Sequence, residues 1–202
     1  MWTRRILLAL VFALAALLSA ARVLAQGAAP DFPTVRRLYT AHEPARAAYA
    51  LNVASVYVRQ QLGRSHDDAV GTRLMAAESR LDQLAAGLRA RAVDSAATLD
   101  SAFAQTDRLL VEHHWRLASW ELGAKDVARA TVGEDLGAAA HFLARSFTFT
   151  GRAPDDATAQ AIAEARRVAD AIATTNALPR DTRDVLETLG RRIVPPATMA
   201  VR

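Results

Sequence analysis

Residues 70–88 read VGTRLMAAESRLDQLAAGL, and this stretch decides the fold class. Its apolar positions recur at alternating steps of four and three residues, and they are Val70, Leu74, Ala77, Leu81, Leu84 and Leu88. Such steps place all six side chains on one face of an α-helix, which turns once in about 3.6 residues. The narrow width of this face is typical of helices packed in a bundle. The stretch therefore predicts an amphipathic, core-facing helix.

Helical patterns continue on both sides of this stretch. They predict a brief helix after Asp31 and longer helices over residues 44–62, 94–122, 132–150, 155–175 and 181–193. Pro44 suits a first helical position, and Gly63, Gly123 and Gly151 follow the ends of three helical runs. No stretch sustains the two-residue alternation of a β-strand. We therefore predict an all-α protein, a single helical bundle of about six helices.

The N-terminus has the layout of a signal peptide. Arg4 and Arg5 precede the apolar run of residues 6–18, and Val23 and Ala25 occupy the small-residue positions before a cleavage site. The apolar run is shorter than the roughly 20 residues that span a bilayer. We therefore expect export, with the periplasm as the destination. An uncleaved signal that anchors the protein to the membrane surface is the alternative.

This interpretation divides the chain into three parts. Residues 1–25 are the expected signal peptide, residues 26–194 the α-helical bundle domain, and residues 195–202 a disordered tail that begins with two prolines. No membrane span is expected after cleavage of the signal peptide. Cleavage would also remove three of the 25 basic residues, which leaves them almost balanced against the 21 acidic ones. A nucleic-acid partner is not expected, because such proteins present a clustered basic face.

A short motif occurs twice in the chain. Residues 63–69 read GRSHDDA, and residues 151–157 read GRAPDDA. Each copy lies between two predicted helices, so the bundle is open to interpretation as two three-helix units, residues 31–122 and 123–194. The alternative is that loops between helices independently acquire glycine and aspartate, because these residues end and cap helices.

Bulky aromatic residues and histidines concentrate in three predicted helices, residues 44–62, 94–122 and 132–150. The helical period places Tyr49 and Asn52 on the apolar face of the first helix, and His113 and Trp120 on that of the second. Ligand pockets are typically apolar with a few convergent polar groups. These four residues therefore form a candidate ligand pocket, and an ordinary core is the alternative interpretation.

A second set of residues forms a candidate metal or haem site. Its members are His42, Glu43, Asp107, His113 and His114. The chain has no cysteine, so disulfides, thiol catalysis and covalent haem attachment through cysteines are excluded. Neither Glu-x-x-His nor His-Glu-x-x-His occurs, so ligation would not follow the common metal-binding motifs of helices.

Ionisable residues recur at every seventh position of the predicted helix 94–122. They are Asp100, Asp107, His114 and Glu121. Neighbours in this series lie about 10.5 Å apart along a helix, too far to share one ion. Any site on this line would need ligands from another helix, and the simpler interpretation is a polar face beside the core.

No sequence motif indicates a reaction. There is no Gly-x-Ser-x-Gly element and no glycine-rich phosphate loop. We therefore expect a non-catalytic exported helical bundle that binds a partner protein or a small ligand. The alternative is a metal- or haem-binding bundle with non-covalent histidine ligation. The cofactor, the partner and the oligomeric state are left open by the sequence.

Overall fold

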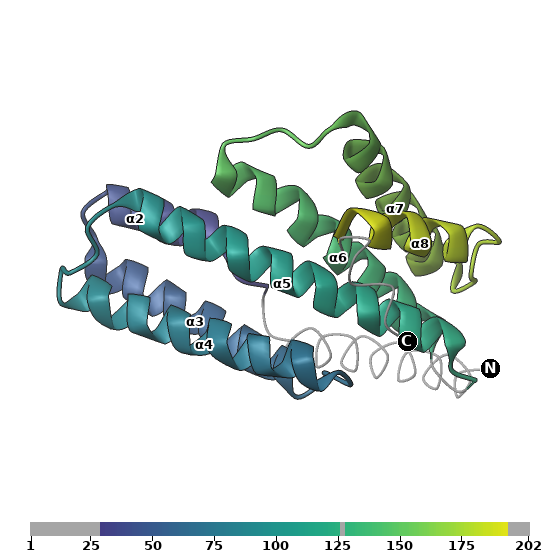
Figure 1. Ribbon diagram of the computed structural model, residues 1–202, viewed down its shortest axis with the longest axis horizontal. Coiled ribbons are helices and arrows are strands. Elements are labelled where there is room, and N and C mark those ends of the chain that lie inside the picture. Colours follow the sequence, from purple (N-terminus) through teal and green to yellow (C-terminus); the bar gives the residue numbers. More distant parts are fainter. Residues whose placement is uncertain (1–28, 126–127, 194–202) are drawn as a thin grey trace, which may run out of the picture.

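The computed structural model describes residues 29–125 and 128–193, and these form seven α-helices and no strand (Figure 1). The helices are α2, Phe32–Thr40; α3, Pro44–Leu62; α4, Asp68–Arg89; α5, Ala96–Gly123; α6, Arg129–Thr150; α7, Asp156–Thr175; and α8, Thr182–Ile193. The predicted all-α bundle is confirmed. The predicted signal peptide and C-terminal tail lie outside the described residues. None of the described helices has the length and hydropathy of a transmembrane segment.

Aspartates and prolines begin most of the helices. Asp31, Asp67 and Asp155 each accept a hydrogen bond from a backbone N–H in the first turn of the following helix. Pro44 is the first residue of α3, as predicted. Helix α6 begins at Arg129, three residues before the predicted start, and the Thr131 hydroxyl donates to a carbonyl of that first turn.

The two copies of the repeated motif are alike only in part. Asp67 and Asp155 both cap the helix that follows them. The glycines differ, because Gly63 has a helical φ of −65° whereas Gly151 is left-handed with a φ of 64°. The two loops therefore follow different paths, and a division into two three-helix units stays a prediction.

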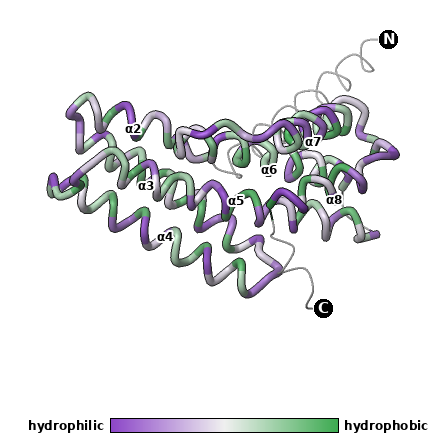
Figure 2. Tube along the Cα trace, turned by 45° about the horizontal axis from the view of Figure 1, so that its top comes forward, coloured by the Kyte–Doolittle hydropathy of each residue, from purple (hydrophilic) through white to green (hydrophobic). Residues whose placement is uncertain are grey.

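Helix α5 runs through the middle of the molecule and contacts α2, α4, α6 and α8 (Figure 1). Most of the other contacts join helices that follow each other in the chain, above all α3 with α4 and α6 with α7. Hydrophilic and hydrophobic stretches alternate along α4, as expected of a helix with one face in the core (Figure 2). The connections α2–α3 and α4–α5 meet at one end of the molecule, away from α7 and α8 (Figure 1).

Helix α3 packs through a different face from the predicted one. Ala47 and Leu51 are fully buried, whereas Tyr49 is 72% and Val56 46% exposed. Asn52 is half-buried. The predicted placement of Tyr49 on the inward face is therefore wrong, and Val56 also faces outward. Small alanines line the buried side of α3, which lets it approach its neighbours closely, because the distance between packed helices depends on the side chains at their contact.

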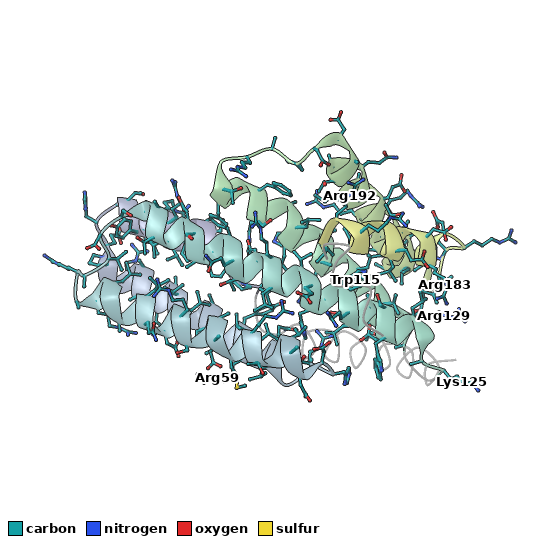
Figure 3. All side chains as sticks on the ribbon, in the orientation of Figure 1. Arg59, Trp115, Lys125, Arg129, Arg183 and Arg192 are labelled. Atoms are coloured by element: carbon teal, nitrogen blue, oxygen red, sulfur yellow. The ribbon has the colours of Figure 1, made fainter. Side chains whose placement is uncertain are left out.

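Helix α8 is fixed to α5 by one tryptophan. The Trp115 indole N–H donates to the Leu186 carbonyl over 2.9 Å, and Figure 3 shows Trp115 between the two helices. The ring lies directly on Gly190, where an added Cβ would come within 2.6 Å of a ring carbon. Trp115 is thus a packing residue of the bundle. Glycine at position 190 is required by this close approach.

Candidate functional site

The ionisable residues at every seventh position of α5 each meet a residue from another element. We call these four residues the polar ladder, and its pairs are Asp100 with Arg36, Asp107 with Arg145, His114 with Asp135, and Glu121 with Arg64. Asp107, His114 and Glu121 are buried. The ladder is therefore part of the core along most of its length, and the interpretation as a polar face beside the core is wrong for these three residues.

The most connected part of the ladder is a buried chain of hydrogen bonds around His114. His114 Nδ1 lies 2.6 Å from Asp135 Oδ1, and His114 Nε2 lies 3.1 Å from the Tyr57 hydroxyl. Arg64 Nη2 donates to the second oxygen of Asp135 over 2.6 Å. Because a carboxylate only accepts, Nδ1 carries a hydrogen that it donates to Asp135, and Nε2 forms the second hydrogen bond of the ring with the Tyr57 hydroxyl. We call Tyr57, Arg64, His114 and Asp135 the buried network.

The buried network sets the charge of its members. Burial alone would raise the pKa of Asp135, but the hydrogen bond from His114 and the charge of Arg64 outweigh it and hold this pKa below its usual value. Burial and the nearby Asp135 charge raise the pKa of Tyr57, so its hydroxyl stays protonated. Glu121 lies beside the network, and burial together with Asp135 raises its pKa to about 7.

His113 differs from its neighbour in having no polar partner for one nitrogen. Within the described part of the chain, His113 Nε2, Ser55 Oγ and Glu121 Oε2 are the buried side-chain atoms that lack a hydrogen bond. Burial and the adjacent His114 lower the pKa of His113 to about 3, so its ring is neutral at ordinary pH. The centroids of the His113 and His114 rings lie 5.2 Å apart. His113 is a buried core residue on the apolar face, where the helical period places it.

The order carboxylate, imidazole, hydroxyl in the buried network matches that of a hydrolase triad, with tyrosine in the place of the nucleophile. Tyr57 is 7%, His114 2% and Asp135 1% exposed. Side chains this buried are shielded from solvent, and their hydrogen bonds satisfy one another across α3, α5 and α6. The arrangement is suited to holding these three helices in register.

The predicted metal set is divided between the surface and the core. His42 is exposed at the α2–α3 connection, and Glu43 pairs with Arg46. Asp107 and His114 are engaged in the core by Arg145 and Asp135. Among residues 29–125 and 128–193, no group of three or more histidine, aspartate or glutamate side chains is arranged to hold a metal ion.

The predicted ligand-pocket set is also divided. Tyr49 and Trp120 lie at the surface, 72% and 52% exposed, whereas His113 is buried and Asn52 half-buried. The Trp120 ring stacks on exposed His66, with 4.2 Å between the ring centroids. These four residues therefore do not line a common interior cavity.

A pocket of about 540 Å³ opens where the α2–α3 and α4–α5 connections meet. We call it the end pocket, and it is lined by Tyr39, Thr40, His42, Pro44, Leu88, Arg91 and Val93. The Tyr39 hydroxyl donates to the Val93 carbonyl over 3.0 Å and so joins the two connections. Pockets for small molecules usually have volumes of about 300–1,000 Å³, so the end pocket has a suitable size.

Two residues of the end pocket have an unusual backbone. His42 and Arg91 have φ angles of 59° and 57°. Each lies one residue beyond the C-cap of a helix. The backbone N–H of the following residue donates to the carbonyl of Leu38 in the first case and of Gly87 in the second, which is the hydrogen bond of a Schellman motif. Glycine is the usual residue at such a position, because the left-handed conformation costs about 1 kcal/mol for a residue that has a Cβ. Within the described chain, neither side chain has an ion-pair or hydrogen-bond partner.

A second, smaller pocket of about 320 Å³ lies between α7 and α8. Glu164 and Asp184 line it together with Arg192, which Figure 3 labels. Both signs of charge are present on its rim. Besides His42 and Arg91, the described chain has one more non-glycine residue with a left-handed backbone, Asn176 at the end of α7. Asn176 does not line this second pocket.

Sequence reasoning missed the end pocket and the partners of the polar ladder. The seven-residue recurrence on α5 was visible, but it does not identify Arg64, Asp135 or Arg145 as the partners. Comparison of the chain with models of protein families, with curated proteins and with solved structures finds no match. The functional interpretation therefore depends on the geometry of the chain itself.

Proposed function

We propose that this protein is a non-catalytic helical bundle that binds a small molecule in the end pocket. The observation that carries the proposal is the pocket itself, about 540 Å³ between two helix-ending turns, with apolar Leu88 and Val93 beside polar Thr40 and His42. An apolar lining with a few polar groups is typical of ligand sites. The buried network supports a non-catalytic role, because its acid–base groups satisfy one another inside the core.

The test is a titration with two fluorescent probes of the same shape. N-phenyl-1-naphthylamine is neutral, and 8-anilino-1-naphthalenesulfonate adds one sulfonate to the same rings. We expect at least one probe to bind the folded protein with a stoichiometry of one. Thr40→Trp places a large side chain in the end pocket and should weaken binding at least tenfold. Direct excitation of the probe above 350 nm avoids interference from the added tryptophan.

The control is Thr188→Trp, which fills the pocket between α7 and α8 instead. It should leave the affinity of the probe unchanged. Circular dichroism of both variants checks that they fold. Equal loss of binding in both variants, or no binding of either probe to the wild type, would contradict the proposal.

We also propose that the protein acts outside the cytoplasm. The support is the N-terminal pattern of Arg4 and Arg5, an apolar run over residues 6–18, and Ala25 before the expected cut. N-terminal sequencing of the protein from cell fractions should find a chain that begins at Gln26 in the periplasmic fraction. A chain that keeps its first residues in the membrane fraction would indicate an uncleaved anchor instead.

A further inference from the structure

We propose that the end pocket selects a small molecule that joins an apolar body to an anionic group, a carboxylate or a phosphate, through Arg91 and His42. The inference rests on the proposed function and adds the chemical class of the ligand. Its basis is the composition of the lining and the two backbone positions that carry the charged and titratable side chains.

The polar groups that line the end pocket fit an anion. The Arg91 guanidinium supplies a permanent positive charge, and the His42 ring adds a nitrogen donor. The hydroxyls of Tyr39 and Thr40 donate to the carbonyls of Val93 and Arg37, so these two side chains complete the lining without offering a proton to the anion. Among the described lining residues, none is acidic. Arginine is well suited to carboxylate and phosphate, because its planar fork donates two parallel hydrogen bonds.

The charge of Arg91 is also not neutralised within the described chain. The nearest acidic residue in sequence to His42 is Glu43, and its carboxylate is engaged by Arg46. No ion pair of Arg91 or His42 occurs within residues 29–125 and 128–193. The two exposed side chains are therefore free to contact a bound anion.

The apolar part of the lining comes from Pro44, Leu88 and Val93. Leu88 is 1% exposed and belongs to the hydrophobic core, so the pocket floor is continuous with the core. A ligand with only a charged group, such as inorganic phosphate, would leave this surface uncovered. The lining thus favours an amphiphile over a simple anion.

The backbone provides an independent reason to connect Arg91 and His42 with binding. Both occupy positions after a helix end where glycine would be free of strain, and both line the same pocket. A side chain kept at a strained position indicates that the side chain itself is useful there. Replacing either residue by glycine should therefore stabilise the fold and at the same time weaken binding of the anion.

The experiment compares the two probes in five proteins, the wild type and four variants. In the wild type, the sulfonate probe should bind at least tenfold more tightly than the neutral probe. Arg91→Gly and His42→Gly should bring the two affinities together and raise the denaturation midpoint. Arg91→Lys keeps the positive charge and should retain part of the preference for the anion. Asn176→Gly relieves a left-handed residue outside the pocket, so it should leave both affinities unchanged.

The outcomes separate the two proposals. Equal affinities of the two probes in the wild type would overturn the anion preference while the end pocket remains a binding site. Absence of binding by either probe would overturn the proposed function as well. The source of the anion is tested by displacing the sulfonate probe with decanoate and by sedimentation with phosphatidylglycerol vesicles. Displacement by decanoate supports a soluble carboxylate, Arg91-dependent sedimentation supports a lipid headgroup, and failure of both overturns the inference.

Discussion

Arg64 and Arg91 each lie two residues beyond the end of a helix, α3 and α4, but their side chains have opposite surroundings. The Arg64 guanidinium reaches Asp135 and becomes part of the buried network. Arg91 is exposed, adopts a left-handed backbone and lines the end pocket without an acidic partner in the described chain. The first arginine is satisfied by the protein itself, and the second is left available to a ligand. The contrast separates a region that stabilises the fold from one that we propose binds a ligand.

The largest expected effect is the removal of the shared carboxylate in the buried network. Asp135→Ala leaves buried His114 without its carboxylate partner and removes the shorter of the two ion pairs of Arg64, and we expect a loss of about 3–5 kcal/mol in the free energy of unfolding. Urea denaturation followed by circular dichroism measures it. Glu164→Ala, which breaks an exposed pair with Arg167, should cost less than about 1 kcal/mol. Similar costs for both variants would mean that the buried network contributes no more to stability than an exposed ion pair.

A smaller effect is expected from two matched tyrosines, one in each region. Tyr57→Phe leaves buried His114 Nε2 without its hydrogen bond and should cost about 1–3 kcal/mol. Tyr39→Phe frees a half-buried carbonyl of the end pocket that water can reach, so it should cost roughly 0.5–1 kcal/mol. Thermal unfolding of both variants gives the comparison. A greater loss for Tyr39→Phe would show that the end pocket, not the network, holds the bundle together.

The smallest expected effect is a dependence of stability on pH that comes from Glu121. The carboxyl has a pKa of about 7 when folded, against an ordinary value of 4.5. As the pH rises from 4.5 to 7, the unfolded chain loses this proton while the folded chain keeps it, so the stability falls over that window. Glu121→Gln cannot titrate and should recover on the order of 1 kcal/mol at pH 8.

The measurement for Glu121→Gln is the difference in unfolding free energy from the wild type between pH 4.5 and 8. His113 acts in the opposite direction, because its pKa of about 3 makes stability fall as the pH drops below 6.5. That contribution is present in both proteins and cancels in the difference. A difference that does not change with pH would mean that Glu121 is ionised in the folded protein throughout.

The sequence predicted the helices well because their ends are marked by local chemistry. Pro44 and Gly151 act within one turn of the chain, and the helix boundaries near them agree with those predicted. The inward face of α3 was missed because small residues, Ala47, Ala48, Ala54 and Ser55, make up half of its buried positions, while larger Tyr49 and Val56 face outward. A pattern of residue size therefore indicated the wrong face of this helix.

The functional regions were less predictable, because both are assembled from distant parts of the chain. Arg64 and Asp135 are 71 residues apart in sequence, and their pairing depends on how α6 packs against α5. The end pocket depends on two helix ends at which the usual signal, glycine, is replaced by His42 and Arg91. The seven-residue spacing on α5 was the one pattern that indicated buried polar residues. It identified the member of each pair on α5 but not the partner from another element.

The close contact of Trp115 with Gly190 has a consequence for the kinetics of folding. Most helix contacts join neighbours in the chain, and such a low contact order is associated with fast folding. The hydrogen bond from Trp115 to Leu186 instead links residues 71 positions apart, so it closes a long loop. Docking of α8 on α5 is therefore a step that the formation of local helix hairpins does not supply. Because the other tryptophan in the described chain, Trp120, is already half exposed, the change in fluorescence on refolding should report mainly this closing step.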